Sequence, residues 1–161
     1  MKWFMKIEQL LSKILKGLIV FCSFCILVLI ITLVILRYGF NSSIVGANEL
    51  VVILFIYTSA LGASLVIGQK GHIAIPYFIE KLPPAFRKTV EFSDYLLIAL
   101  LNGVMIWYSF RWIRITGGYL TAVLRIPQLY AQIVIPIGCG LAIFYCIHNI
   151  VILINPKTDT V

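Results

Sequence analysis

Charged residues are scarce in this chain, and acidic ones are the scarcest. Of the 161 residues, 12% are charged and only six are Asp or Glu. A soluble domain carries about 25% charged residues, so this composition lies outside the range of water-soluble globular proteins. The sequence also lacks a phosphate-binding loop, a nucleophile constellation and paired carboxylates. It therefore gives no support for an enzyme.

Acidic residues are missing from the apolar runs as well. The nearest candidate is Glu49, which stands at the start of one run. A proton-coupled exporter needs a carboxylate within the membrane. The pattern therefore argues against a self-contained homo-oligomeric four-helix carrier or exporter, which stays as the alternative function.

Long apolar runs are abundant, since 61% of the residues are hydrophobic. Four runs are long enough to cross a hydrocarbon core about 30 Å thick. We expect transmembrane spans at residues 17–36, 50–67, 95–112 and 132–154. A segment in lipid must satisfy its own backbone hydrogen bonds, so each span should be a helix. The expected fold is all-α, an integral membrane four-helix protein in which residues 1–161 form a single membrane domain.

Residues 1–16 form a basic, amphipathic arm before the first span. Its lysines, Lys2, Lys6, Lys13 and Lys16, fall on the face opposite its apolar residues. This pattern is typical of a helix that lies in the membrane interface with its lysines toward phospholipid headgroups. The alternative is that the arm simply extends the first span. No small-residue cleavage site follows that span, so we expect it to stay in the mature protein.

The distribution of Lys and Arg predicts how the chain crosses the membrane. Nine of these residues lie in the arm, in the connection at residues 68–92 and in the tail, while four lie at the opposite ends of the spans. Basic loops stay in the cytoplasm, so both termini and the 68–92 connection are expected there. The formal net charge of +7 comes from residues flanking the spans, and we therefore expect no nucleic-acid partner.

Small residues recur at every fourth position in two of the spans. Such ladders let two helices approach closely. The expected helix-packing residues are Ala60, Gly62, Ser64, Gly68, Gly138 and Ala142, with Cys146 continuing the second ladder. The spacing leaves open whether the two ladders pack within the chain or against another protein.

Isolated polar residues mark the ends and middles of the spans. Asn102 lies near the middle of its span and is expected to form a hydrogen bond with another helix. Asn48 fits the N-cap of the second span, and Glu49 follows it in the first turn. Glu49 would be stabilised there by the helix dipole, or by a partner such as Arg37.

Cysteines and histidines offer only weak signals of chemistry. Cys22 and Cys25 have the spacing of a redox or metal motif, but they lie in an uncharged span where packing is the favoured role. His72 and His148 are the two histidines, too few and too far apart to favour a haem-binding anchor. His148 and Asn149 are interpreted as an interfacial hydrogen-bonding pair. We expect no cofactor or metal in this chain.

Short motifs spread over the four spans resemble the small membrane subunit of TRAP (tripartite ATP-independent periplasmic) transporters. The resemblance covers residues from about Arg37 to Gly138. The matching positions are Arg37, Glu49-Leu50, Leu61-Gly62-Ala63, Gly71-His72-Ile73, Leu82-Pro83, Ile126-Pro127 and Pro136-Ile137-Gly138.

The resemblance implies a partner and a place. Such a subunit pairs, in the bacterial inner membrane, with a large membrane subunit that holds the sodium and substrate sites. A periplasmic binding protein delivers an organic acid of the sialic acid or C4-dicarboxylate type, and the small subunit acts as a scaffold. Arg37, Glu49 and Arg125 would then help to dock the binding protein, and Gly71 and His72 would form the cytoplasmic turn.

Overall fold

The computed structural model describes residues 2–69 and 84–154, with side chains described from Glu8 to Gln69 and from Lys88 to Leu153. The helices are α1 (Lys2–Gly39), α2 (Ala47–Gly68), α4 (Pro84–Thr116), α5 (Leu129–Gln132) and α6 (Val134–Ile154). The described part of the chain contains no strand, only an isolated bridge between Leu120 and Pro127. The predicted all-α class is confirmed.

Four helical segments are long and apolar enough to cross a membrane, as the sequence predicted. They are Glu8–Gly39, Ala47–Gly68, Lys88–Thr116 and Leu129–Leu153, the last combining α5 and α6. The chain is therefore a multi-pass membrane protein. Most of its large apolar side chains on α1 and α4 are exposed, as expected for surfaces that contact lipid rather than water.

Helix α1 differs from the expected arm followed by a separate span. It runs through its 38 residues without a break at residues 16–17, so the arm is the extension of the span that the sequence offered as the alternative. At 1.5 Å per residue, α1 is about 57 Å long, well beyond a hydrocarbon core of about 30 Å. Gly17 does not interrupt it, because one glycine costs a helix only about 1 kcal/mol.

Helix α4 also begins earlier than the expected span. It starts at Pro84, where a proline at the first helical position loses no intrahelical hydrogen bond. Residues 84–92, expected in the connection, are therefore helical. At the other end, the Gly117 N–H donates to the Ile113 carbonyl at 2.8 Å and closes the last turn.

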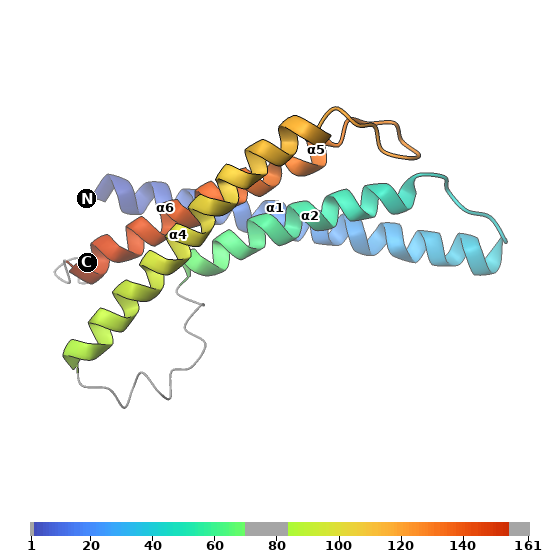
Figure 1. Ribbon diagram of the computed structural model, residues 1–161. Helices are drawn as coiled ribbons and strands as arrows, with labels where there is room; N and C mark the ends of the chain where they lie inside the picture. The colour runs from blue at the N-terminus through green and yellow to red at the C-terminus, as the bar shows by residue number, and fades with distance from the viewer. Residues whose placement is uncertain (1, 70–83, 155–161) are drawn as a thin grey trace.

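The four long helices form a row rather than a closed bundle. Helix α1 packs on α2, α2 on α6, and α6 on α4 (Figure 1), and no comparable packing joins α1 to α4 among the described residues. Helix α6 is inside the row: 39% of its apolar stretch is buried, against 6% for α1 and for α4.

The two ends of the molecule carry different parts of the chain. The N-terminal end of α1 and the C-terminal end of α6 lie at one end, together with the end of α2 and the start of α4 (Figure 1). The connections at residues 40–46 and 117–128 lie at the other, which we call the loop end. This arrangement follows from four antiparallel crossings.

Candidate functional site

The two small-residue ladders face each other across α2 and α6. A Cβ added to Gly138 would lie 2.8 Å from the backbone oxygen of Ala60, so only a glycine fits there. Ser64 and Ala142 are 1% and 2% exposed. Two helices can approach so closely only where side chains are this small. The ladders therefore pack within the chain, one of the two possibilities that the sequence left open.

Tyr145 joins three helices at the end of this contact. Its ring covers Gly68 of α2, where an added Cβ would come within 2.6 Å of it, and the side chain is fully buried. Its hydroxyl lies 2.9 Å from the Ser12 hydroxyl of α1, which in turn donates to the Glu8 carboxylate at 3.1 Å. The bond between Tyr145 and Ser12 holds this part of α1 against α6.

A second polar contact ties α6 to the end of α2. The Asn149 side chain is 3% exposed and its amide donates to the Ile67 carbonyl at 3.0 Å. Its neighbour His148 makes no such pair: its Nε2 is buried and has no partner within the described residues. The interfacial hydrogen bond expected of the two residues is therefore made by Asn149 alone.

Gly62 does not belong to this contact. A Cβ added there would meet nothing within 4 Å. Position 62 is two residues from Ala60 and from Ser64, and residues two apart on a helix do not share a face. Gly62 therefore takes no part in the close contact of α2 with α6 among the described residues, and its predicted role in helix packing stays a prediction for a contact with another protein.

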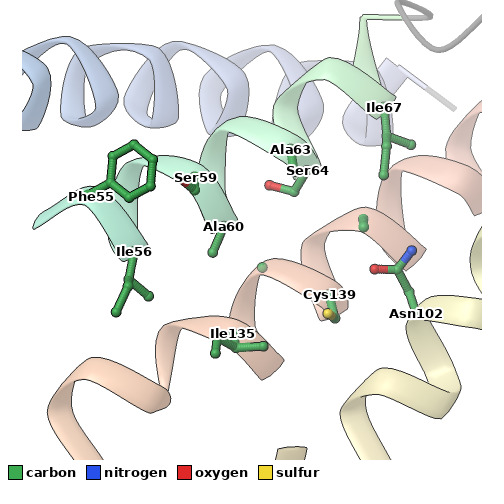
Figure 2. Close-up of a pocket in the computed structure, with 12 residues that line it drawn as sticks. Phe55, Ile56, Ser59, Ala60, Ala63, Ser64, Ile67, Asn102, Ile135 and Cys139 are labelled. Atoms are coloured by element: carbon green, nitrogen blue, oxygen red, sulfur yellow. The ribbon is translucent and has the colours of Figure 1, made fainter. Parts of the chain in front are cut away.

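An open apolar groove of about 390 Å³ lies beside the ladders, between α2 and α4 and over α6 (Figure 2). Small side chains line it, with larger ones toward its ends. The lining includes Ser59, Ala60, Ala63, Ile135, Cys139 and Asn102.

Asn102 is the polar group that α4 contributes to the groove, and its hydrogen bond differs from the one expected. Its amide donates to the Ile98 carbonyl, four residues earlier on the same helix, at 2.8 Å. The expected bond to another helix is therefore not formed among the residues that the structure describes. The side chain lines the groove instead (Figure 2).

Glu49 organises the loop end. Its two carboxylate oxygens accept the backbone N–H groups of Val123 and Leu124 at 2.8 and 2.9 Å. Glu49 makes no ion pair within residues 2–69 and 84–154, so the suggested partner Arg37 is replaced by backbone donors. Hydrogen bonds from N–H groups to an ionised carboxylate are among the stronger ones in proteins.

The N-cap of α2 is Gly46, not Asn48. Gly46 has φ 92°, a left-handed conformation that glycine adopts readily. A Cβ there would come within 2.8 Å of the Leu124 side chain. The connection at residues 117–128 thus rests on the start of α2 through both its backbone and Leu124. Glu49 lies in the first turn, as predicted.

The connection itself is ordered by its own hydrogen bonds. Thr121 N–H donates to the Ile126 carbonyl at 2.9 Å and Gln128 N–H to the Tyr119 carbonyl at 2.8 Å. Between these pairs, Arg125 is exposed and has φ 51°. A residue with a side chain is uncommon in this region of the backbone map.

The remaining predicted site residues are scattered. Arg37 is exposed in the last turn of α1, and Lys13 and Lys16 are exposed near the opposite end of that helix. The side chains of Lys2 and Lys6, and the turn at Gly71 and His72, lie outside the described residues.

The cysteines do not gather. Cys22 and Cys25 belong to α1, Cys139 and Cys146 to α6, and all four are free. Residues 2–69 and 84–154 contain no group of three His, Cys, Asp or Glu side chains placed to hold a metal ion. Cys146 and Cys22 are buried among apolar neighbours, which agrees with a packing role.

Sequence reasoning missed Tyr145, Gly46 and the backbone donors of Glu49. A glycine directly before a span was the one available signal, because glycine is accepted at N-caps. Tyr145 lies in an apolar run with nothing to distinguish it. The N–H groups at positions 123 and 124 are present in every sequence, so no pattern of side chains could reveal them.

Comparisons with known proteins give the family. Residues 26–155 match the family model described as tripartite ATP-independent periplasmic transporters, DctQ component. Two putative TRAP transporter small permease proteins of Haemophilus influenzae are similar. One is 31% identical over 87 residues (52% of this chain, 54% of that protein), and the other 38% over 91 residues (54% and 53%).

A third similar protein is the C4-dicarboxylate TRAP transporter small permease protein DctQ of Vibrio cholerae. It is 31% identical over 117 residues, which are 67% of this chain and 49% of that protein. The chain spans about half the length of the curated relatives it matches. The family match itself covers most of the chain, including α2, α4 and α6. The chain therefore belongs to the DctQ family, whose members are membrane components of tripartite ATP-independent periplasmic transporters and not enzymes.

Proposed function

We propose that this chain is the small membrane subunit of a sodium-driven, binding-protein-dependent importer of organic acids. Its partners are a large membrane subunit and a periplasmic binding protein. The observation that carries the proposal is the apolar groove along α2, α6 and α4, which is open and lies between helices long and apolar enough to cross a membrane. The C4-dicarboxylate named for the Vibrio cholerae relative gives the first substrate class to test, with sialic acids second.

The role we propose for the chain is that of a scaffold. Tight packing of α2 on α6 through Gly138 and the three-helix contact at Tyr145 favour a rigid body. A row of helices also extends further within the membrane plane than a closed bundle of the same helices. A moving transport domain needs such a wide, fixed neighbour, because its own displacement would otherwise tilt the subunit that holds it.

The groove is the surface that we assign to the large subunit. Its floor carries Ala60, Ala63 and Gly138, and small residues let a helix of the partner approach closely in lipid. Asn102 adds a carboxamide that can hydrogen-bond to the partner without leaving its own helix. We assign the sodium ions to the large subunit, as the resemblance to TRAP transporters implies.

The loop end is the surface that we assign to the binding protein. This places both termini in the cytoplasm and residues 117–128 in the periplasm of a bacterial inner membrane. Arg37 and Arg125 supply exposed positive charges there, and Glu49 acts by holding the loop that presents Arg125. Strained backbone at an exposed position suggests that its side chain serves a function.

At the cytoplasmic end, Lys2, Lys6, Lys13 and Lys16 are assigned to phospholipid headgroups. Each basic residue near an anionic membrane surface contributes about 1 kcal/mol. Together with the extension of α1, these contacts would resist tilting of the scaffold.

Mass spectrometry of the proteins that co-purify with the tagged full-length chain in mild detergent tests the assignment. A stoichiometric membrane partner with many more spans is the expected result. A stable homo-oligomer without a second membrane protein would contradict it and would favour the alternative of a self-contained exporter. In that case the next measurement is proton-coupled efflux.

Two substitutions at one position test the docking surface. Arg125→Gly removes the charge and suits the left-handed backbone, whereas Arg125→Glu reverses the charge. We expect the reversal to weaken binding of the binding protein to the reconstituted complex by about tenfold or more, and the removal by less, because interface charges act through complementarity. Lys13→Glu, at the other end, is the control. Unchanged affinity in Arg125→Glu would exclude this residue from the docking surface.

A further inference from the structure

A cluster of aromatic and basic side chains lies on α4 near the loop end, outside the groove and the connection already described. Trp107, Phe110, Arg111 and Arg114 line a hollow of about 530 Å³, which we call the α4 patch. Trp107 and Phe110 are 74% and 57% exposed, and both arginines are exposed. Such exposed aromatic side chains have a cost in water, so the patch requires a surrounding that is at least partly apolar.

The α4 patch faces away from the rest of the chain. Helix α4 is the outermost helix of the row and packs on α6. Near the loop end, Ser109 marks the buried side of α4, since it is 6% exposed. At 100° per residue, Trp107, Arg111 and Arg114 lie within about 40° of the side of the helix opposite to Ser109, and Phe110 lies about 100° from Ser109. Nothing within the described part of the chain covers them.

The two arginines are free to bind an anion. Neither has a hydrogen bond or an ion pair within residues 2–69 and 84–154. They are three residues apart on a helix, which places them on one side as neighbours. A guanidinium binds phosphate through two parallel N–H groups, a geometry that a lysine ammonium lacks.

The two arginines and Trp107 of the α4 patch lie at different depths along the helix axis. Arg114 lies in the last turn of α4, which ends at Thr116. Trp107 is seven residues earlier, or about 10 Å deeper along the axis. Tryptophan rings favour the boundary between headgroups and acyl chains, and arginine stems reach from there toward the water. The patch therefore spans the depth of one phospholipid headgroup and its glycerol.

We propose that the α4 patch binds an anionic phospholipid at the loop end of the membrane. Arg111 and Arg114 hold the headgroup phosphate, and Trp107 and Phe110 lie along the glycerol and the first acyl carbons. A water-soluble partner would not reach the rings at the depth of Trp107, whereas a lipid supplies both the anion and the apolar part. This site is separate from the lysines of α1, which lie at the other end of the molecule.

Quenching of Trp107 fluorescence by brominated lipids tests the proposal. The full-length chain carries Trp3→Phe and Trp112→Phe, so that Trp107 is the remaining tryptophan. This variant is reconstituted with brominated phosphatidylglycerol or with brominated phosphatidylcholine. We expect phosphatidylglycerol to be preferred at least about fivefold, the effect of one basic group near an anionic lipid surface. Arg111→Gln with Arg114→Gln should abolish the preference, so that both lipids quench Trp107 equally.

Matched controls separate a built site from general charge. Arg37→Gln with Arg125→Gln removes the same charge from the same end and should leave the preference unchanged. Arg111→Lys with Arg114→Lys should retain only part of it. Native mass spectrometry of the chain without tryptophan substitutions should likewise retain phosphatidylglycerol over phosphatidylcholine. Soluble glycerol phosphate should not reverse the quenching. Equal quenching by both lipids would overturn the proposal and leave the patch as a surface for a protein.

Discussion

At the scale of single residues, the chain depends on positions where a side chain is absent. Gly138 lets the backbone of α6 meet the Ala60 carbonyl, and Gly46 turns the chain into α2 with a left-handed φ. The small-residue spacing was visible in the sequence, and so the α2–α6 contact could be predicted. The partner of Glu49 could not, because it is a backbone segment 74 residues away.

Gly138→Ala should destabilise the protein. The added methyl group would lie 2.8 Å from the Ala60 oxygen, and the backbone of α2 would have to move. We expect a loss of about 1–3 kcal/mol, the usual cost of overpacking, measured as thermal unfolding in detergent. Gly140→Ala is the control, since an added Cβ there meets nothing within 4 Å. Equal stability of the two variants would contradict the close approach.

Glu49→Gln should loosen the connection at residues 117–128. The substitution keeps the size of the side chain but replaces one acceptor oxygen with an amide that cannot accept the second N–H. We expect faster hydrogen exchange at Val123 and Leu124, followed by mass spectrometry or NMR. Asn48→Ala changes a neighbouring exposed residue and should leave exchange at both amides unchanged. Unaltered protection in Glu49→Gln would mean that the loop is held by Leu124 and its own hydrogen bonds.

At the scale of elements, apolar runs identified every span but not every boundary. Each predicted span ended at the first charged residues, whereas a helix can continue through a charged segment outside the membrane. Residues 84–92 and the basic arm therefore appear as parts of α4 and α1. The length of an apolar run does not reveal which helices pack together. The order of the helices in the row could therefore be learned only from the structure.

A large side chain in the groove should weaken the contact with the large subunit. Ala63→Trp would fill part of the space that we assign to a partner helix, and small residues at such contacts are what permits close approach. We expect the amount of co-purified large subunit to fall at least about threefold. Ile31→Trp is the control, since Ile31 is 50% exposed on α1, a helix that does not line the groove. Equal recovery with both variants would place the partner elsewhere.

At the scale of the whole molecule, the arrangement follows from the parity of the crossings and the placement of basic residues. Four antiparallel spans bring both ends of the described chain to one side (Figure 1). The distribution of Lys and Arg predicts which side that is, because basic loops stay in the cytoplasm.

A reporter fused after Val161 tests the predicted orientation. A phosphatase that works only in the periplasm should be inactive there, and a fluorescent protein that folds in the cytoplasm should be bright. The same pair of reporters inserted after Arg125, at the tip of the connection, should give the opposite result. Activity of the phosphatase at Val161 would reverse the orientation and would place the α4 patch on the cytoplasmic side.

During synthesis, α6 is the last span to leave the ribosome, yet its place in the row is between α2 and α4. Helices α1 and α2 can pair as soon as both have entered the membrane, since they are neighbours in the row. Helix α4 has its main contact with α6, so it waits in lipid without a helical neighbour of its own chain until α6 is inserted. A ribosome that stalls before Val134 would thus leave α4 accessible to membrane proteases. Completion of the chain therefore supplies the one helix that covers a face of α4 to any large extent among the described residues.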